Sequence, residues 1–247
     1  MKIIDLVIVI PTLNEQHYIG ELLDSLGKQT ILPAEIMVVD ACSKDKTKEE
    51  VMKRKTLFPS LSFESIPKKT IAMQRNFGAS KTKAPHILFL DADMVFAKKD
   101  TMQRLWQHVQ KKQPDVATCY VMPLSGERTD KLMYGTGNIL TTVMRSIKPL
   151  GTTMNLYVKR EVFEALGGFD QDVRVGEDFE FLSRAAKQDF SFNVFMRPIL
   201  YTSVRRLEYE GRIRFVGKLL KSIFYAKRFG HSKNPITYKF GHFSKKV

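Results

Sequence analysis

The feature that most constrains this chain is an apolar run close to its start. Residues 3–10 read IIDLVIVI, with aspartate as the one charged residue. A run that is apolar at nearly every position, instead of at alternate positions, is typical of a strand buried on both faces of a parallel sheet. Such a strand needs helices on both sides, so the run predicts an α/β domain.

Strand-like and helix-like segments alternate along the first half of the chain. Further strands are expected at residues 35–40, 61–66, 86–93 and 115–123, and helices at 15–28, 43–55, 70–83 and 100–112. This alternation makes βαβ units, so we predict a doubly wound sheet of Rossmann-like type with helices on both faces. Beyond residue 123 the periodicity no longer orders the elements, although residues 191–196 have a strand pattern.

Polar residues gather where the predicted strands end. They are Thr12, Asn14 and Glu15 after the first strand, Asp40 after the second, and Asp91 and Asp93 after the fourth. Ligands of open α/β sheets bind at the carboxyl ends of the strands. These three separate segments are therefore expected to meet at one edge of the sheet.

Asp91 and Asp93 have only an alanine between them, within HILFLDADMVF. Two carboxylates this close repel each other unless a hard cation binds both. The alternative is that Asp91 ends the strand while Asp93 caps the next helix. Because Asp40 and Glu15 are expected on the same edge, we favour a site for Mn²⁺ or Mg²⁺ that holds diphosphate oxygens.

The formal net charge of +14 indicates an anionic partner, which is nucleic acid, a phosphorylated small molecule or lipid headgroups. The two cysteines, Cys42 and Cys119, show neither a disulfide framework nor a zinc-binding spacing, so a reducing cytoplasm is expected. Since no stretch approaches the roughly 20 apolar residues that span a bilayer, any membrane contact is expected to be peripheral, on the inner face of the cell membrane.

Five short motifs then point to a family. VIVIPTLNE, VVDACSKDKT, QRNFGAS, LFLDADM and GEDFEFLSRA occur in the order and spacing of family 2 glycosyltransferases, and the similarity covers about residues 3–206. The resemblance implies a GT-A fold with a mixed sheet, and a catalytic domain at 1–206. It also implies a hexosyltransferase-type enzyme that inverts the anomeric configuration of the transferred sugar. The implied donor is a nucleotide-diphospho sugar, and in most of the family it is UDP-linked.

The resemblance also implies roles for single residues. Around the nucleotide it places Pro11, Thr12, Glu15, Asp40 and Arg75, and it makes Asp91 a ribose or metal-bridging carboxylate and Asp93 a direct metal ligand. The residues themselves leave alternatives open: helix capping for Thr12 and Asn14, and an exposed ion pair for Arg75. For Ser43 and Asp45 we favour turn and capping contacts that support Asp40.

The second half of the implied site lies in VRVGEDFEF. There the resemblance makes Asp178 the base that takes a proton from the acceptor, with Glu177 beside it at the substrate and as the first alternative base. Interaction of these acidic residues with a helix N-terminus is the other interpretation. Arg205 and Arg206, in TSVRR, are expected to contact the diphosphate or an anionic acceptor, or else to be solvated surface residues.

The sequence also departs from part of the family. The Gln-x-x-Arg-Trp motif of processive synthases is absent, because the one tryptophan is Trp106. Transfer of one sugar, to a glycan or lipid-linked acceptor in cell-envelope or polysaccharide synthesis, is therefore expected instead of polymerisation. Acceptor specificity is expected between Tyr134 and Asn155.

Two other functions remain to be compared. Sugar-1-phosphate nucleotidyltransferases are recognised by a glycine-rich loop with a lysine near the N-terminus. The corresponding segment here, IPTLNEQHYIG, has no such loop. Only the net charge favours a nucleic-acid-binding protein, and the acidic strand ends have the opposite local charge. We therefore expect no nucleic-acid partner.

Residues 207–247 are expected to form a separate basic segment. Within 211–230, apolar residues recur at helical spacing: Ile213, Phe215, Val216, Leu219, Leu220, Ile223 and Phe224. Basic residues flank or oppose them: Arg212, Arg214, Lys218, Lys221, Lys227 and Arg228. The pattern predicts a basic amphipathic helix that either packs on the catalytic core or lies on a membrane surface.

Overall fold

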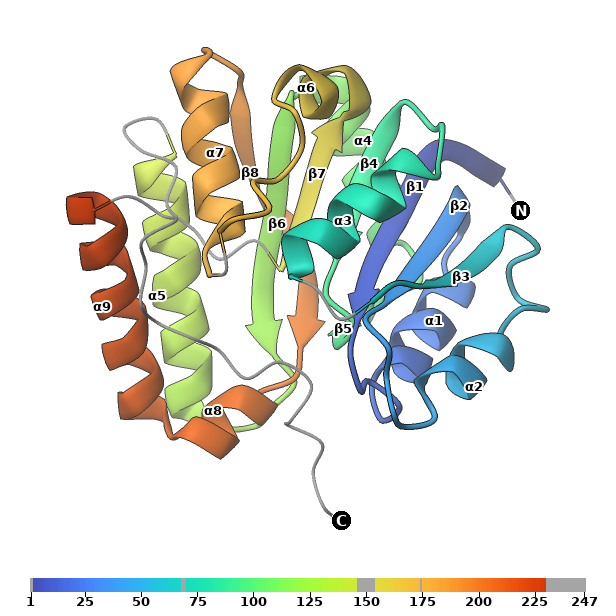
Figure 1. Cartoon of the computed structure of the whole chain (residues 1–247), viewed down its shortest axis with the longest axis horizontal. Coiled ribbons are helices and arrows are strands. Elements are labelled where there is room, and N and C mark those ends of the chain that lie inside the picture. Colours follow the sequence, from blue (N-terminus) through green and yellow to red (C-terminus); the bar gives the residue numbers. More distant parts are fainter. Residues whose placement is uncertain (1, 68–69, 146–153, 174, 230–247) are drawn as a thin grey trace.

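The structure is a computed structural model, and it describes residues 2–67, 70–145, 154–173 and 175–229. Within these residues one sheet of eight strands has the order β3-β2-β1-β4-β7-β6-β8-β5, with helices on both sides (Figure 1). The strands are β1 (Lys2–Thr12), β2 (Ile31–Asp40), β3 (Leu61–Ser65), β4 (His86–Leu90), β5 (Met94–Val95), β6 (Val116–Pro123), β7 (Asn155–Lys159) and β8 (Phe192–Thr202). The helices are α1 (Ile19–Gly27), α2 (Thr47–Met52), α3 (Ile71–Ser80), α4 (Thr101–Lys112), α5 (Arg128–Met144), α6 (Arg160–Ala165), α7 (Glu177–Lys187), α8 (Arg205–Glu210) and α9 (Arg212–Phe229).

The sheet is mixed, as predicted. β1 pairs in parallel with β2 and β4, and β2 with β3, whereas β7 runs antiparallel to both β4 and β6. Only three residues separate β4 from β5, yet β5 is the last strand in the order and pairs with β8. The sheet must therefore curl until the end of β8 reaches the carboxyl end of β4.

The first strand confirms burial on both faces. Leu6, Ile8 and Ile10 pack into a core with residues of α1 and α4. Val7 and Val9 point to the other side and pack with residues of α3, α6 and α7. From Leu6 onward neither face of β1 meets water, and this part of the strand is apolar at nearly every position, whereas Ile3 and Asp5 near its start are exposed.

Helix α3 lies unusually close to the sheet at Gly78. A Cβ atom on this residue would lie 2.4 Å from Cγ1 of Val9 and 3.1 Å from Cγ2 of Val39. One turn earlier, Nε2 of Gln74 donates to the carbonyl oxygens of Thr12 (2.8 Å) and Val39 (2.7 Å). The glycine of QRNFGAS therefore lets α3 dock directly on the carboxyl ends of β1 and β2.

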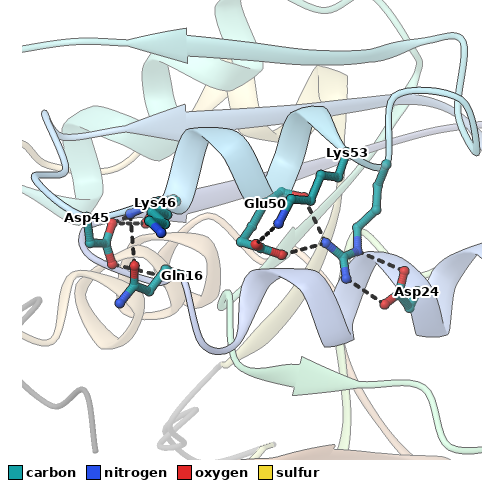
Figure 2. A network of polar contacts seen from close by, with 8 residues as sticks. Gln16, Asp24, Asp45, Lys46, Glu50 and Lys53 are labelled. Carbon is teal, nitrogen blue, oxygen red and sulfur yellow. Dashed lines mark hydrogen bonds and ion pairs between the residues drawn. The ribbon is translucent and has the colours of Figure 1, made fainter. Parts of the chain in front are cut away.

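The loops after β1 and β2 are joined by side chains (Figure 2). Oδ2 of Asp45 accepts from the backbone N–H of Gln16 (3.1 Å), whose Oε1 accepts from the N–H of Lys46 (2.9 Å). Further along, Arg54 forms two hydrogen bonds of 2.8 Å with Asp24 on α1. The turn role predicted for Asp45 is confirmed, because its carboxylate holds two loops together.

Some boundaries differ from those predicted. α1 begins at Ile19 instead of residue 15, because Asn14 has a left-handed φ of 56° and residues 16–18 form a turn. The backbone carbonyl oxygen of Glu15 accepts hydrogen bonds from the N–H groups of both Tyr18 and Ile19. The second half of the chain, which periodicity did not order, contains α5, β7 and α6.

The predicted C-terminal helix is present as α9, but its apolar residues do not share one environment. Ile213 is 90 % exposed, whereas Phe215 is partly buried. The other members of the stripe from Leu219 onward, and Lys227 among the basic residues, lie outside the described side chains. In the part of the chain that the structure describes, no helix is long and apolar enough to cross a membrane.

Candidate active site

A polar pocket of about 130 Å³ lies at the carboxyl ends of the central strands. Its walls come from β1, the loop between β4 and β5, the end of β8, and α8. The polar and charged residues that line it are Thr12, Glu15, Gln74, Asp91, Asp93, Tyr134, Thr202, Ser203, Arg205 and Arg206. Pro11 lines it as well. Segments from the two ends of the sequence therefore form one site, and the predicted convergence of strand ends is observed.

Asp91 and Asp93 both line the pocket, in the short connection between β4 and β5. The N–H of Asp91 donates to the oxygen of Met154 at 3.0 Å, which continues the antiparallel pairing of β4 with β7. Asp93 accepts from the hydroxyls of Ser203 (2.6 Å) and Thr202 (3.3 Å). The capping alternative for Asp93 is not what the structure shows, because β5 follows it at once.

Arg205 joins the two ends of the sequence across the pocket. Its two terminal nitrogens donate to the carboxylate of Glu15 at 2.6 and 2.8 Å, and its Nε lies 3.3 Å from Oδ2 of Asp93. The guanidinium also stacks on the ring of Tyr18, 4.3 Å from its centre. Arg205 is therefore not a solvated surface residue. Its positive charge is paired with the carboxylates of Glu15 and Asp93.

Burial dominates the electrostatics of these acids. It raises the pKa of Glu15 to about 7 and that of Asp91 to about 6, although nearby arginines act in the opposite direction. The negative charge of Asp93 adds to both shifts. A cation or a further basic group that approached these carboxylates would therefore be bound favourably.

Asp40 supports the pocket from behind and is not among the described residues that line it. Its Oδ1 accepts from the hydroxyls of Thr12 (3.0 Å) and Ser43 (2.5 Å), and its Oδ2 accepts from the N–H of Ser43 (2.8 Å). The supporting turn role predicted for Ser43 is confirmed. Whether Asp40 also contacts a nucleotide stays a prediction.

Arg75 is buried, so an exposed ion pair does not describe it. One terminal nitrogen donates to Asp91 at 3.0 Å and the other to Glu177 at 3.1 Å. The guanidinium lies over the ring of Phe169, 5.3 Å from its centre. Arg75 thus connects the loop after β4 to the first turn of α7, and its contact with base or diphosphate stays a prediction.

Glu177 and Asp178 open α7, directly after Gly176, whose φ of 79° is in the left-handed region. This conformation turns the chain so that both acids begin the helix beside Arg75. Burial and the neighbouring charge of Asp178 raise the pKa of Glu177. Neither acid is among the described residues that line the pocket, so the site consists of a pocket with an adjoining acidic helix end.

The family model of Glycosyl transferase family 2 matches residues 7–166, which is well over half of the chain and includes the strand ends described above. The chain belongs to glycosyltransferase family 2. Asp178 and Arg205 lie beyond the matched range, so their place in the site rests on the structure and on the motifs that contain them.

Two relatives illustrate the similarity within family 2. An uncharacterized glycosyltransferase of Haemophilus influenzae is 27 % identical over 186 residues, covering 73 % of this chain and 62 % of that protein. Poly(ribitol-phosphate) beta-N-acetylglucosaminyltransferase TarS of Staphylococcus aureus is 28 % identical over 130 residues, covering 51 % of this chain and 22 % of its own. The chain thus spans less than two thirds of either relative.

Solved structures show the same fold. Mannosyltransferase PcManGT from Pyrobaculum calidifontis, in complex with GDP-Man and Mn²⁺, gives a TM-score of 0.71 at 22 % identity, over 94 % of this chain and 66 % of that one. TarS 1-349 in complex with UDP-GlcNAc gives a TM-score of 0.64 at 21 % identity, over 82 % of this chain and 58 % of that one. The curled mixed sheet is therefore that of GT-A glycosyltransferases, as the motifs implied.

The acids of the pocket suit a metal that is shared with a phosphate ligand. Among the described residues there is no group of three or more histidine, cysteine, aspartate or glutamate side chains that could hold a metal ion unaided. Mg²⁺ is commonly held by one or two carboxylates together with substrate phosphates. Asp91 and Asp93, on the wall of one pocket, provide the donor set of that kind of site.

Sequence reasoning missed three residues at this family 2 site. Gln74, which fixes α3 to the strand ends, directly precedes Arg75 in QRNFGAS. Thr202 and Ser203, which donate to Asp93, directly precede the two arginines of TSVRR. Both motifs had been singled out for their arginines alone, although the neighbouring polar residues were visible in the same letters.

Proposed function

We propose that the protein is an inverting glycosyltransferase that moves one sugar from a nucleotide-diphospho sugar to an acceptor hydroxyl. The observation that carries this proposal is the meeting of Asp91, Asp93 and Arg206 with the Glu15–Arg205 pair in one pocket at the carboxyl ends of the strands. Family membership supports this proposal over the nucleotidyltransferase and nucleic-acid-binding alternatives.

The donor is assigned to this pocket. Pro11, Thr12 and Glu15 would border the base and ribose, with Asp40 holding that loop in place. Arg205 and Arg206 would face the diphosphate, whose negative charge suits them. We propose a UDP-linked sugar, in keeping with the S. aureus TarS structures that contain UDP-GlcNAc and UDP. The mannosyltransferase structure with GDP-Man makes GDP the competing base to test.

Asp93, with Asp91, would hold a divalent cation, Mn²⁺ or Mg²⁺. Such a cation supplies positive charge that stabilises the departing nucleoside diphosphate. The acids of the chain would fix its position, while Thr202 and Ser203 orient the Asp93 carboxylate through their hydroxyls.

Asp178 is proposed as the base. The acceptor hydroxyl oxygen attacks the anomeric carbon from the face opposite the diphosphate, the new carbon–oxygen bond forms as the bond to the diphosphate breaks, and the proton passes to the Asp178 carboxylate. Glu177, whose carboxylate accepts from Arg75 at 3.1 Å, is the first alternative base.

Arg75 would set the distance between the donor-binding loop after β4 and the helix α7 that carries the proposed base. It contacts Asp91 on the donor side and Glu177, the neighbour of the proposed base. The two ion pairs fix α7 relative to the loop after β4. A productive reaction needs the attacking and leaving groups aligned, so this connection is expected to matter for the rate more than for donor affinity.

The wider setting follows the same reasoning. We propose residues 1–206 as the catalytic unit and 207–247 as an appended basic segment, acting in the cytoplasm in cell-envelope or polysaccharide synthesis. The relative RfbN of Salmonella typhimurium is named an O-antigen chain rhamnosyltransferase, which is consistent with such a pathway. The acceptor would be a glycan or a lipid-linked molecule.

Calorimetric titration with UDP and GDP, each with and without Mn²⁺, tests the proposal. We expect metal-dependent binding of UDP that Asp93→Asn abolishes, because an amide removes the anionic ligand. Asp24→Asn is the matched control, since Asp24, on α1, pairs with Arg54 away from the pocket. Unchanged metal-dependent binding in Asp93→Asn, or no nucleotide binding by the unmodified protein, would overturn the assignment.

We also propose peripheral contact with an anionic membrane surface, through α5 and α9. α5 exposes apolar side chains, which are Leu132, Ile139, Leu140 and Val143. α9 exposes basic ones, among them Arg214, Lys221 and Arg228. Basic residues beside exposed apolar residues suit an anionic lipid interface.

Co-sedimentation with liposomes checks the membrane contact. Binding should rise with the fraction of anionic lipid and fall with salt. Since each cation near an anionic leaflet contributes about 1 kcal/mol, changing Arg214, Lys221 and Arg228 together to glutamine should weaken binding on the order of 10²-fold. If the unmodified protein failed to sediment with anionic vesicles at low salt, the contact would be excluded.

A further inference from the structure

A second, larger pocket adjoins the proposed active site. It measures about 320 Å³ and lies between β6, β8, α5 and the start of α9. Four residues line both this pocket and the polar one: Tyr134, Met154, Leu207 and Phe215. The two pockets are thus neighbours that share these lining residues. We refer to the second one as the α5 pocket.

The α5 pocket exists because β6 separates from β7. The two strands pair at Val116 and Ala117 only, after which β6 continues to Pro123 beside β8. Beyond this point, asparagine side chains form hydrogen bonds with backbone groups of β6 that β7 does not pair with. Asn155 bonds the N–H (2.7 Å) and oxygen (3.2 Å) of Cys119, and Asn138 bonds the N–H (3.1 Å) and oxygen (2.8 Å) of Val121. Space remains between the strand and α5.

The walls of this space are mainly apolar. Besides the shared residues, the apolar side chains are Val121, Met133, Leu140, Val194 and Val216. A pocket of this volume with predominantly apolar walls is within the ordinary range of small-molecule sites. Burying an apolar group here would be favourable, because water in such a cavity has few hydrogen-bond partners.

Six hydroxyl or amide side chains line the pocket among the described residues, and all of them except Tyr134 are engaged within the protein. The hydroxyl of Thr118 donates to the oxygen of Asn155 (2.7 Å), and that of Thr141 to the oxygen of Gly137 (3.0 Å). Thr136 donates to the oxygen of Met133 (2.9 Å). Tyr120 bonds to a threonine hydroxyl, and Asn138 bonds to β6. A polar ligand would have to compete with these bonds, whereas an apolar one would not.

We infer that the α5 pocket binds the apolar chain of an amphiphilic acceptor, an alkyl or prenyl chain attached to a hydroxyl-bearing head. This inference rests on the proposed function, since the pocket for the chain adjoins the polar pocket assigned to the donor, so that the head would meet the donor sugar. The site then has a charged half for the donor and head, and an apolar half for the chain. Leu140 and Val216, at the exposed rim, lead the chain toward the apolar surface of α5.

The test uses n-alkyl β-glucosides as probes, below their micelle concentrations, with methyl β-glucoside as the headgroup control. Binding is followed by NMR of the methionine methyl groups. Met133 and Met154 line the pocket and should shift saturably with the octyl compound. Met102 lies in the core under α4 and should not. Each methylene buried is worth about 0.8 kcal/mol, so affinity should rise about fourfold per added carbon until the pocket is full.

Two glycines of α5 give a matched pair of variants. A Cβ on either Gly135 or Gly137 would have nothing within 4 Å, so both positions accept a side chain and both gain helix propensity. Gly137 lines the pocket and Gly135 does not. Gly137→Leu should weaken octyl glucoside binding at least tenfold, while Gly135→Leu should leave it unchanged.

Several outcomes would overturn the inference: no shift of Met133 or Met154, equal shifts with methyl and octyl glucosides, or equal binding by the two glycine variants. The donor titration separates this inference from the proposed function. UDP binding without octyl glucoside binding would remove the chain site and keep the enzyme assignment. Octyl glucoside binding without nucleotide binding would keep an apolar-chain site and remove the glycosyltransferase proposal.

Discussion

Asn155 is expected to be one of the most sensitive polar positions of the fold. It is 1 % exposed, and its side chain occupies the place of a missing strand beside β6, where it bonds both backbone groups of Cys119. Asn155→Leu keeps the branched shape and the number of side-chain heavy atoms, and it removes both bonds. The N–H and oxygen of Cys119 would then be buried without partners.

The size of the effect follows from the burial of these two groups. A buried backbone group without a partner costs about 1–3 kcal/mol, so two such groups should lower the free energy of unfolding by about 2–6 kcal/mol. Asn138 offers a matched comparison, because its side chain makes the same two bonds to Val121 of the same strand. It is only partly buried. Since water can replace its bonds, Asn138→Leu should cost about 1–3 kcal/mol.

Urea unfolding followed by circular dichroism would measure both variants. The expected order is wild type, then Asn138→Leu, then Asn155→Leu as the least stable, with similar urea dependence of the unfolding free energy. If Asn155→Leu lost less than about 1 kcal/mol, or if the two variants lost the same amount, burial of the orphaned Cys119 groups would not be the cause and the reasoning would be wrong.

Three further predictions concern the site and its surroundings. Asp178→Asn should leave the Kd for the nucleotide sugar unchanged and lower kcat by ~10²–10⁴-fold, because a base acts on the acceptor only in the transition state; near-normal turnover would move the base elsewhere. Arg75→Met should lower the free energy of unfolding by about 3 kcal/mol at pH 8, since it leaves Glu177, which is largely buried, and Asp91, which is partly exposed, without their guanidinium partner. Burial raises the pKa of both carboxyl groups and Arg75 limits the rise, so in the variant both pKa values should lie above those of the wild type. The folded variant then binds more protons than the folded wild type, and its deficit should shrink from pH 8 to pH 5; a deficit independent of pH would contradict this. Burial also raises the pKa of the Cys119 thiol, whereas Cys42 is exposed, so a thiol reagent should modify one cysteine per folded chain and both after unfolding.

Much of the architecture was encoded locally. The apolar run of β1, broken only by Asp5, indicated a strand covered on both faces, and its alternate residues do enter two separate cores. The alternation of strands and helices predicted the order of elements up to β6, except for the two-residue strand β5. The carboxyl ends of parallel strands lie at the same edge of a sheet, so Thr12, Glu15, Asp91 and Asp93 could be placed together from the sequence. All four line one pocket.

The partners of those residues were decided only by the tertiary structure. Glu15 is paired with Arg205, which is 190 residues away, and Arg75 with Glu177, which is 102 residues away. The α5 pocket likewise depends on where β6 leaves β7, a point that no periodicity marks. Hydrophobic period and turn residues specify each element and its ends, because those properties arise from neighbours in sequence. Which distant charge meets which depends on the order and curl of the strands, and these emerge only when the whole sheet packs.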